Sequence, residues 1–106
     1  MLLALSTSCR YCRESASFYR ALAQSVDGAE DLVAVFPQGQ AEVDDYLRDA
    51  SVYIHVVPNL ALVSLGVSST PTLMLLSSTG VVQDVWMGRL NGRGQQEVLA
   101  KLRGLQ

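Results

Sequence analysis

The chain has 106 residues, of which 49% are hydrophobic and 17% are charged, so it can build a core and is not a disordered segment. Its length fits one domain, which we place over residues 1–106. The net charge of −2 and the scattered basic residues argue against nucleic-acid binding, and no apolar run reaches the roughly 18 residues that span a membrane.

The first part of the chain predicts a strand and then a helix. Residues 1–6 form a largely apolar run, which is typical of a strand buried on both faces. Residues 13–25 have the apolar spacing of a helix, with Ser8 as its predicted N-cap and Gly28 as its stop.

The middle of the chain continues this alternation. Residues 32–36 predict a second buried strand, and residues 42–50 predict a short acidic helix. Residues 53–57 are rich in β-formers and predict a further short strand, which is followed by one or two helical turns that end at Gly66.

The last part predicts a hairpin and a helix. Residues 72–76 and 81–87 are expected to form antiparallel strands joined by a tight turn. Asn91 can cap a final helix, whose apolar positions have helical spacing: Val98, Leu99 and Leu102. Strands that alternate with helices predict an α/β domain with a mostly parallel sheet, to which the hairpin adds an antiparallel edge.

The only cysteines, Cys9 and Cys12, lie between the first strand and the first helix. At this spacing on the first turn of a helix, two thiols lie on one side and can close a small disulfide ring. A CxxC pair between a strand and a helix indicates a dithiol redox site. A structural disulfide or an idle pair of thiols stays open as an alternative.

The position of each thiol predicts its role. Disulfide exchange needs one thiolate that attacks and a second thiol that resolves the mixed disulfide. Cys9 is at the helix N-terminus, where the helix dipole and the charges of Arg10 and Arg13 favour a thiolate, so we expect its pKa to fall below about 8.5. Cys12 lies one turn further on and is the expected resolving thiol. The acids between residues 27 and 49 are expected on a distant, solvated face.

Three features together resemble the thioredoxin superfamily over nearly the whole chain. They are the CxxC motif at a strand-to-helix junction, the Gly-Val-Ser-Ser-Thr-Pro-Thr loop at residues 66–72, and the strand, turn and strand that end at Gly88. The late segment is most similar to thioredoxin-like proteins of the TlpA and cytochrome-maturation type. The resemblance implies a central mixed sheet flanked by helices, with a C-terminal β-hairpin and helix, and with the family's first strand and helix absent or truncated.

The resemblance also implies a substrate site. A cis peptide bond is expected before Pro71, which would pack beside the cysteines, and the backbone of Thr70 would pair with an extended protein segment. Tyr11, between the cysteines, is a further candidate for substrate contact or a turn residue that faces solvent. The chain departs from thioredoxin itself, because Ser8 replaces the usual tryptophan, no proline separates the cysteines, and the first strand carries no acid.

The predicted function is thiol–disulfide oxidoreduction, in which the dithiol carries both electrons and no cofactor is required. The expected partners are protein thiols and disulfides and a redox partner protein or membrane electron donor, and the domain is expected to be a monomer. The resemblance and the abrupt start of the chain predict a fragment of an exported, membrane-tethered protein in the periplasm or another extracytoplasmic space. A cytoplasmic location stays open.

Two other functions remain as alternatives: a redox-inactive binding module and, less favoured, a copper-handling metallochaperone. His55 could serve a metal, but a lone histidine is more often a surface residue, and we predict no metal site. Glu14 is disfavoured as a proton acceptor because it points to another side of the helix. Glutaredoxin is disfavoured because only Gly88 stands where that family has paired glycines. Trp86 is expected to pack, and Gly88 to mark a close backbone approach.

Overall fold

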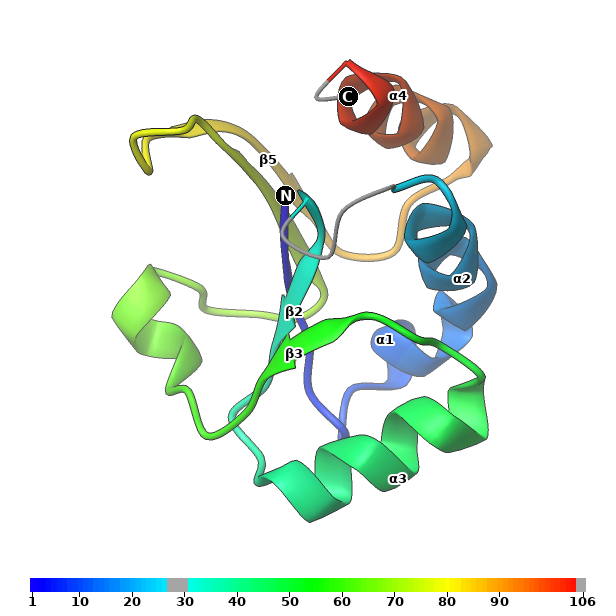
Figure 1. The fold of residues 1–106 in the computed structure, drawn as a ribbon, viewed down its shortest axis with the longest axis vertical. Coiled ribbons are helices and arrows are strands. Elements are labelled where there is room, and N and C mark those ends of the chain that lie inside the picture. The colour runs from blue at the N-terminus through cyan, green and yellow to red at the C-terminus, as the bar shows by residue number, and fades with distance from the viewer. Residues whose placement is uncertain (27–30, 105–106) are drawn as a thin grey trace.

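The computed structural model describes residues 1–26 and 31–104, so the predicted helix stop at Gly28 lies outside the described residues. The chain forms an α/β fold around a five-stranded sheet with the strand order β3-β2-β1-β4-β5 (Figure 1). The strands are β1 (Leu2–Ala4), β2 (Val33–Val35), β3 (His55–Val57), β4 (Thr72–Leu76) and β5 (Val82–Met87).

The sheet is mixed, as the resemblance implied, and has more antiparallel pairing than the alternation of elements predicted. β1 pairs with β2 and β2 with β3 in parallel, whereas β4 is antiparallel to both β1 and β5. The prediction of a mostly parallel sheet is therefore wrong. The segment between β3 and β4 begins and ends at the same end of the sheet, so β4 starts where β1 finishes, with Thr72 opposite Ala4.

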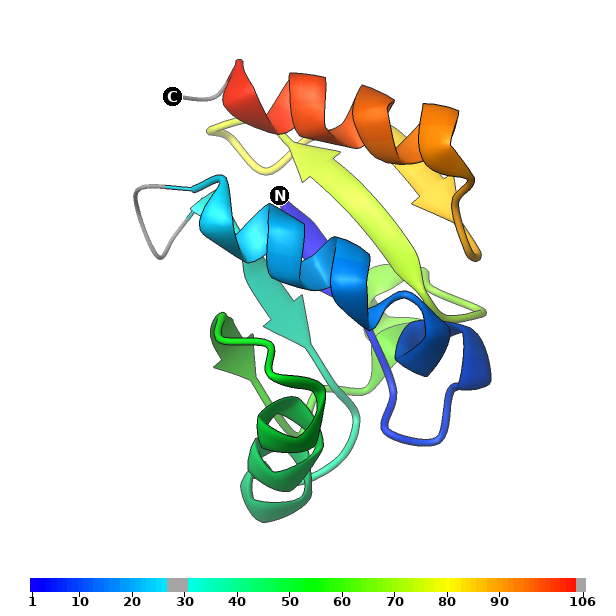
Figure 2. The same cartoon turned by 90° about the vertical axis from the view of Figure 1, so that its right-hand side faces the viewer.

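The helices cover the two faces of the sheet unequally. α1, α2 and α4 lie on one side, and the 3₁₀ helix η2 lies on the other (Figures 1 and 2). Asn91 caps α4 as predicted, because its Oδ1 accepts from the N–H of Gly94 at 2.9 Å. The helices are α1 (Arg10–Glu14), α2 (Ala16–Gln24), α3 (Gln40–Ala50), η2 (Leu62–Leu65) and α4 (Gly92–Arg103).

The helix predicted over residues 13–25 is interrupted by Ser15. This residue is buried, with φ −96° and ψ 9°, and it separates α1 from α2. The cap predicted at Ser8 is also wrong: the hydroxyl of Ser8 bonds to that of Ser6, and Cys9 is the N-cap of α1. The sulfur of Cys9 accepts the hydrogen bond that a serine cap would otherwise take.

β1 lies at the centre of the sheet, and its side chains enter apolar clusters on both faces, as predicted for a strand buried on both sides. Leu3 and the following Leu5 join the cluster under the α-helices, and Ala4 joins the cluster on the face of η2. Because β1 is fixed from both sides, the loop that follows it starts from a rigid position. Each α-helix adds a buried residue to the first cluster, among them Cys12, Leu22, Val43 and Val98.

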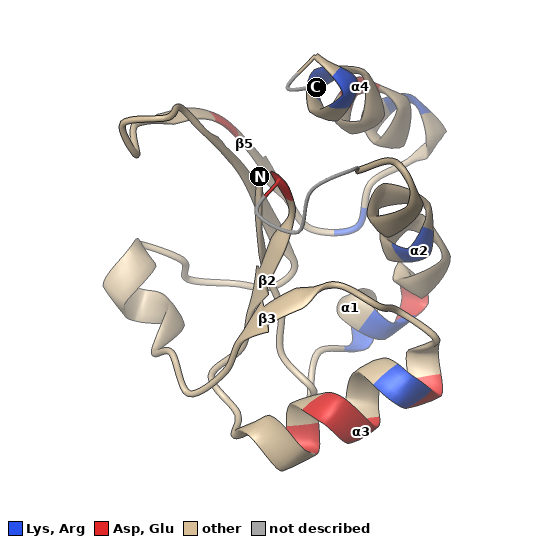
Figure 3. Ribbon diagram, viewed as in Figure 1, with Lys and Arg blue, Asp and Glu red and all other residues tan. Residues whose placement is uncertain are grey.

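Charged side chains gather on the helices. The sequence between residues 50 and 83 contains no Asp, Glu, Lys or Arg. Figure 3 shows η2 and its flanking loops without charge, whereas α1, α3 and α4 carry charged segments.

Candidate active site

Cys9 and Cys12 lie where the chain passes from β1 into α1. Their Cα atoms are 5.2 Å apart and their Sγ atoms are at bonding distance, so the pair forms a disulfide. Cys9 is half-buried, whereas Cys12 has no exposed surface. The N–H of Cys12 donates to the Sγ of Cys9 at 3.1 Å. An N–H donor at a helix N-terminus stabilises negative charge on a sulfur atom, so Cys9 has the surroundings that an attacking thiolate needs.

The peptide bond between Thr70 and Pro71 is cis, as the resemblance implied. Pro71 is buried directly before β4, and the register of β4 against β1 places Thr72 opposite Ala4. This register brings the cis-proline loop to the end of the sheet from which the chain enters the cysteine pair. The loop is also tied to the end of β5, because the N–H of Gly88 donates to the carbonyl of Pro71 at 2.8 Å.

No family model and no curated protein matches the sequence. Solved structures match its fold. StoA from Bacillus subtilis has a TM-score of 0.73 and 17% identity, over 93% of this chain and 78% of that one. A Chlorobium tepidum protein named as a thiol:disulfide interchange protein DsbE has a TM-score of 0.74 and 20% identity, over 95% and 77%. A secreted Mycobacterium tuberculosis disulfide oxidoreductase, homologous to DsbE of E. coli, has a TM-score of 0.70 and 11% identity, over 97% and 78%.

This chain has a thioredoxin fold. Its β1 is the strand that leads into the cysteines, so the strand and helix that precede it in the family are not among these 106 residues, as the resemblance implied. Pro71 lies next to the junction of α1 and α2, since it lines a small hollow together with Ser15 and Gly88. The thioredoxin fold thus brings the CxxC helix and the cis-proline loop together across 60 residues of sequence.

The other predicted site residues of α1 have different surroundings. Tyr11 is 53% exposed. Arg10 is exposed, and its Nε lies 3.8 Å from the carboxylate of Glu14. Arg13 is exposed and acts on Tyr46 of α3: burial raises the pKa of Tyr46, and the positive charge of Arg13 offsets part of this rise. Both arginines therefore bring positive charge to α1, and Glu14 balances part of the charge of Arg10.

Arg89 is a neighbour of the site to which the sequence did not point. It follows Gly88, and its Nη1 lies 3.6 Å from the carboxylate of Glu14. The ion pair links the loop after β5 to α1. Glu14 therefore lies between two arginines, Arg10 and Arg89.

Glu42 corrects the expectation that the acidic segment lies far from the cysteines. Its carboxylate accepts a hydrogen bond from the hydroxyl of Thr7, in the loop that leads to Cys9. Gln38 bonds to the same loop through its side-chain amide. These contacts join residues 31 to 35 positions apart, and no motif marks them. The packing of α3 beside the β1–α1 loop brings this acid to the loop that leads to Cys9.

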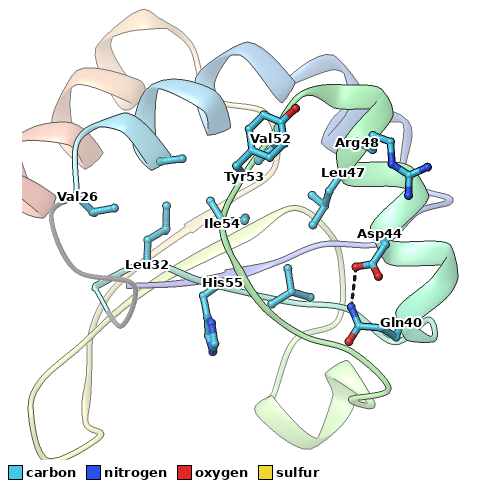
Figure 4. Close-up of a pocket in the computed structure, with 12 residues that line it drawn as sticks. Val26, Leu32, Gln40, Asp44, Leu47, Arg48, Val52, Tyr53, Ile54 and His55 are labelled. Atoms are coloured by element: carbon cyan, nitrogen blue, oxygen red, sulfur yellow. Dashed lines mark hydrogen bonds between the residues drawn. The ribbon is translucent and has the colours of Figure 1, made fainter.

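His55 lies away from the cysteines. It is exposed at the start of the edge strand β3, and the sheet register aligns it with Val33 and Leu2, at the end of the strands opposite to Cys9. Figure 4 shows it at the rim of a hollow of about 750 Å³ that α2, α3 and β3 line. In the part of the chain that the structure describes, no three His, Cys, Asp or Glu side chains form a group that could hold a metal ion.

Trp86 and Gly88 lie at the end of β5 near the cis-proline. Trp86 is half-buried against the main core, as expected for a packing residue, and its Nε1 donates to Glu97 of α4 at 3.2 Å. β5 ends before Gly88 and the N–H of Gly88 closely approaches the backbone of Pro71, as expected, but a Cβ here would meet no atom within 4 Å, so this approach leaves room for a side chain. Glycine suits this position because its φ is +79°, a conformation that lets its N–H reach Pro71.

Proposed function

We propose that this chain is a thiol–disulfide oxidoreductase that exchanges a Cys9–Cys12 dithiol or disulfide with protein substrates. The observation that carries the proposal is the position of the pair: the sulfur of half-buried Cys9 caps the N-terminus of α1, Cys12 is covered, and the cis-proline loop lies at the same end of the sheet. The names of two similar structures, a thiol:disulfide interchange protein and a disulfide oxidoreductase, support the same chemistry.

In the reducing direction, the reaction has two displacements. The Cys9 thiol loses its proton to solvent, and the thiolate attacks one sulfur of a substrate disulfide. That S–S bond breaks, and the departing thiolate takes up a proton. The Cys12 thiol then loses its proton and its thiolate attacks the Sγ of Cys9, which breaks the mixed disulfide; the second substrate sulfur leaves as a thiolate and takes up a proton. Two electrons pass from the dithiol to the substrate, and the same steps in reverse oxidise a substrate dithiol. No cofactor is needed.

Three residues around the pair are proposed to contact the substrate. Tyr11 is an exposed aromatic residue between the cysteines, and Thr70 and Pro71 form the loop at the same end of the sheet. An extended substrate segment that lies along this loop would present its sulfur to Cys9. Arg10 and Arg13 are proposed to lower the pKa of the Cys9 thiol through their positive charge.

The proposed cellular setting is that of an exported, TlpA-type protein. One similar structure is a secreted disulfide oxidoreductase, which favours an extracytoplasmic location such as the periplasm. Of the helices that the structure describes, none is long and apolar enough to cross a membrane. In that setting a redox partner protein or a membrane electron donor would regenerate the dithiol.

Trapping of mixed disulfides tests the proposal. In Cys12→Ser the attacking thiol of Cys9 remains, but no resolving thiol is present to break its mixed disulfide with a substrate. Substrates should therefore accumulate as disulfides with Cys9 in the native host. Cys9→Ser is the matched control and should trap none. If neither variant traps a protein, and the parent chain does not exchange its disulfide with glutathione, the chain is a redox-inactive binding module. Stoichiometric Cu(I) uptake that Cys9→Ser abolishes would instead support the metallochaperone.

A further inference from the structure

The loop between β1 and α1 is held by side chains that follow β2. The Oε1 of Gln38 accepts from the N–H of Thr7 at 3.2 Å, and its Nε2 donates to the hydroxyl of Ser6 at 2.9 Å. Glu42, in the first turn of α3, accepts from the hydroxyl of Thr7. We call these four residues the α3 clamp. It holds the loop through one backbone N–H, that of Thr7, and through the hydroxyls of Ser6 and Thr7.

The α3 clamp acts on the turn that carries the attacking sulfur. Cys9 comes two residues after Thr7, and its N–H donates to the carbonyl of Ser6 at 3.2 Å, which closes the turn. The carboxylate of Glu42 is therefore tied through one hydroxyl to the turn that ends at Cys9. Glu42 is exposed, so water weakens the electrostatic effect of its charge on nearby groups, and added salt screens this effect further.

We propose that Glu42 is a positioning residue of the dithiol site: it holds the turn before Cys9 and keeps one negative charge on that turn, where it opposes formation of the Cys9 thiolate. This inference rests on the proposed thiol–disulfide exchange. A nearby carboxylate favours the protonated thiol because like charges repel. Glu42 thus works against the helix N-terminus and the arginines, and the balance sets the fraction of Cys9 that is ionised.

Other charges around the site have to be separated from that of Glu42. Asp45 offers a matched control, since it lies on the same helix and pairs with Arg48 at 3.2 Å, outside the clamp. Asp45→Asn removes the same charge from α3 and leaves the contacts with the loop unchanged. Four further charged side chains lie on α1 and on the loop after β5: Arg10, Arg13, Glu14 and Arg89.

The test measures the ionisation of Cys9 through the pH dependence of its alkylation by iodoacetamide. It uses the Cys12→Ser chain, in which Cys9 is the single thiol. Glu42→Gln keeps an acceptor oxygen for Thr7 and removes the charge. We expect it to raise the alkylation rate below the thiol pKa by about twofold to fivefold, and about 1 M salt to shrink this difference. Asp45→Asn should leave the profile unchanged.

A second variant separates positioning from charge. Thr7→Val keeps the carboxylate of Glu42 but removes the hydrogen bond that holds it. It should therefore raise the alkylation rate of Cys9 less than Glu42→Gln does. Glu42→Gln should then add less in the Thr7→Val chain than in the parent, because the two changes remove the same contact. Thr7→Ser, which retains the hydroxyl, should restore the parent profile. Far-ultraviolet circular dichroism establishes that each variant is folded.

Two outcomes would overturn the inference. One is an identical pH profile for Glu42→Gln and its parent, and the other is an equal change in Asp45→Asn. Neither depends on a substrate, since alkylation reads the thiol directly. Failure of the proposed function has a different signature: Cys12→Ser traps no protein, and the unsubstituted chain does not exchange its disulfide with glutathione, whatever the alkylation profile.

Discussion

The N–H of Cys12 donates to the Sγ of Cys9 at 3.1 Å, so the sulfur of one cysteine caps the helix that buries the other. Cys9 is half-buried and Cys12 has no exposed surface, although only two residues separate them. The first turn of α1 therefore gives the two thiols unequal access and unequal electrostatic surroundings, and the first prediction follows from this difference.

In the reduced protein, Cys9 should react with a small alkylating reagent at least about 10 times faster than Cys12, because it is accessible and its thiolate accepts an N–H. Peptide mass spectrometry at short reaction times measures the two rates. The same reduced chain in concentrated urea is the control, where the rates should agree within about twofold since both thiols are then solvated. Equal rates in the folded protein would contradict the assignment of Cys9 as the attacking thiol.

Leu22→Ala should lower the free energy of unfolding by about 2–5 kcal/mol, because the side chain has no exposed surface and its loss leaves a cavity under α2. Urea unfolding of the oxidised protein measures the change. Val63→Ala on η2 is the control: Val63 is 80% exposed, so the change should stay within about 0.5 kcal/mol. A similar loss for both variants would show that the main core does not lie under the α-helices.

Gly88→Ala should cost about 1 kcal/mol of stability. The cost arises from the backbone alone, since φ is +79° and the new Cβ would meet no atom within 4 Å. Gly92→Ala is a matched control with the same open space and no positive φ, at the first residue of α4. There the change should leave stability equal or raise it by up to about 1 kcal/mol. Thermal or urea unfolding distinguishes these opposite signs.

The buried side chain of Tyr19 should make the protein less stable at high pH. Burial raises the pKa of Tyr19 above its ordinary value, and a hydrogen bond with Ser15 offsets a small part of this rise. In the unfolded chain this tyrosine ionises near pH 10, while the folded protein keeps its proton. The unfolded state then binds fewer protons, so the free energy of unfolding falls as the pH rises above about 10.

Tyr19→Phe should therefore lose less stability between about pH 9 and pH 11 than the parent protein, as measured by urea unfolding at each pH. Tyr53→Phe is the control, because Tyr53 is 78% exposed, and its pH dependence should match that of the parent. An unchanged slope for Tyr19→Phe would mean that the phenol gains access to solvent in the native protein.

Local signals in the sequence predicted several elements because each depends on residues close together in the chain. The hairpin of β4 and β5 follows from two β-rich runs around a tight turn, and the cap of α4 follows from Asn91 before an amphipathic stretch. Ser15 shows the limit of such signals, because helical periodicity runs through it while its backbone, at φ −96° and ψ 9°, leaves the helical conformation and ends α1 there.

Short stretches of the sequence were enough to predict that Cys9 and Cys12 lie at a strand-to-helix junction of an α/β domain, since spacing and periodicity are local properties. Which distant side chains reach the loop before that pair could be seen only in the folded chain. The tertiary structure placed His55 at the other end of the strands and brought Glu42 onto the loop before Cys9. Contacts of this kind join residues more than 30 positions apart, and they arise from the register of the sheet and the packing of α3, which no short stretch of sequence encodes.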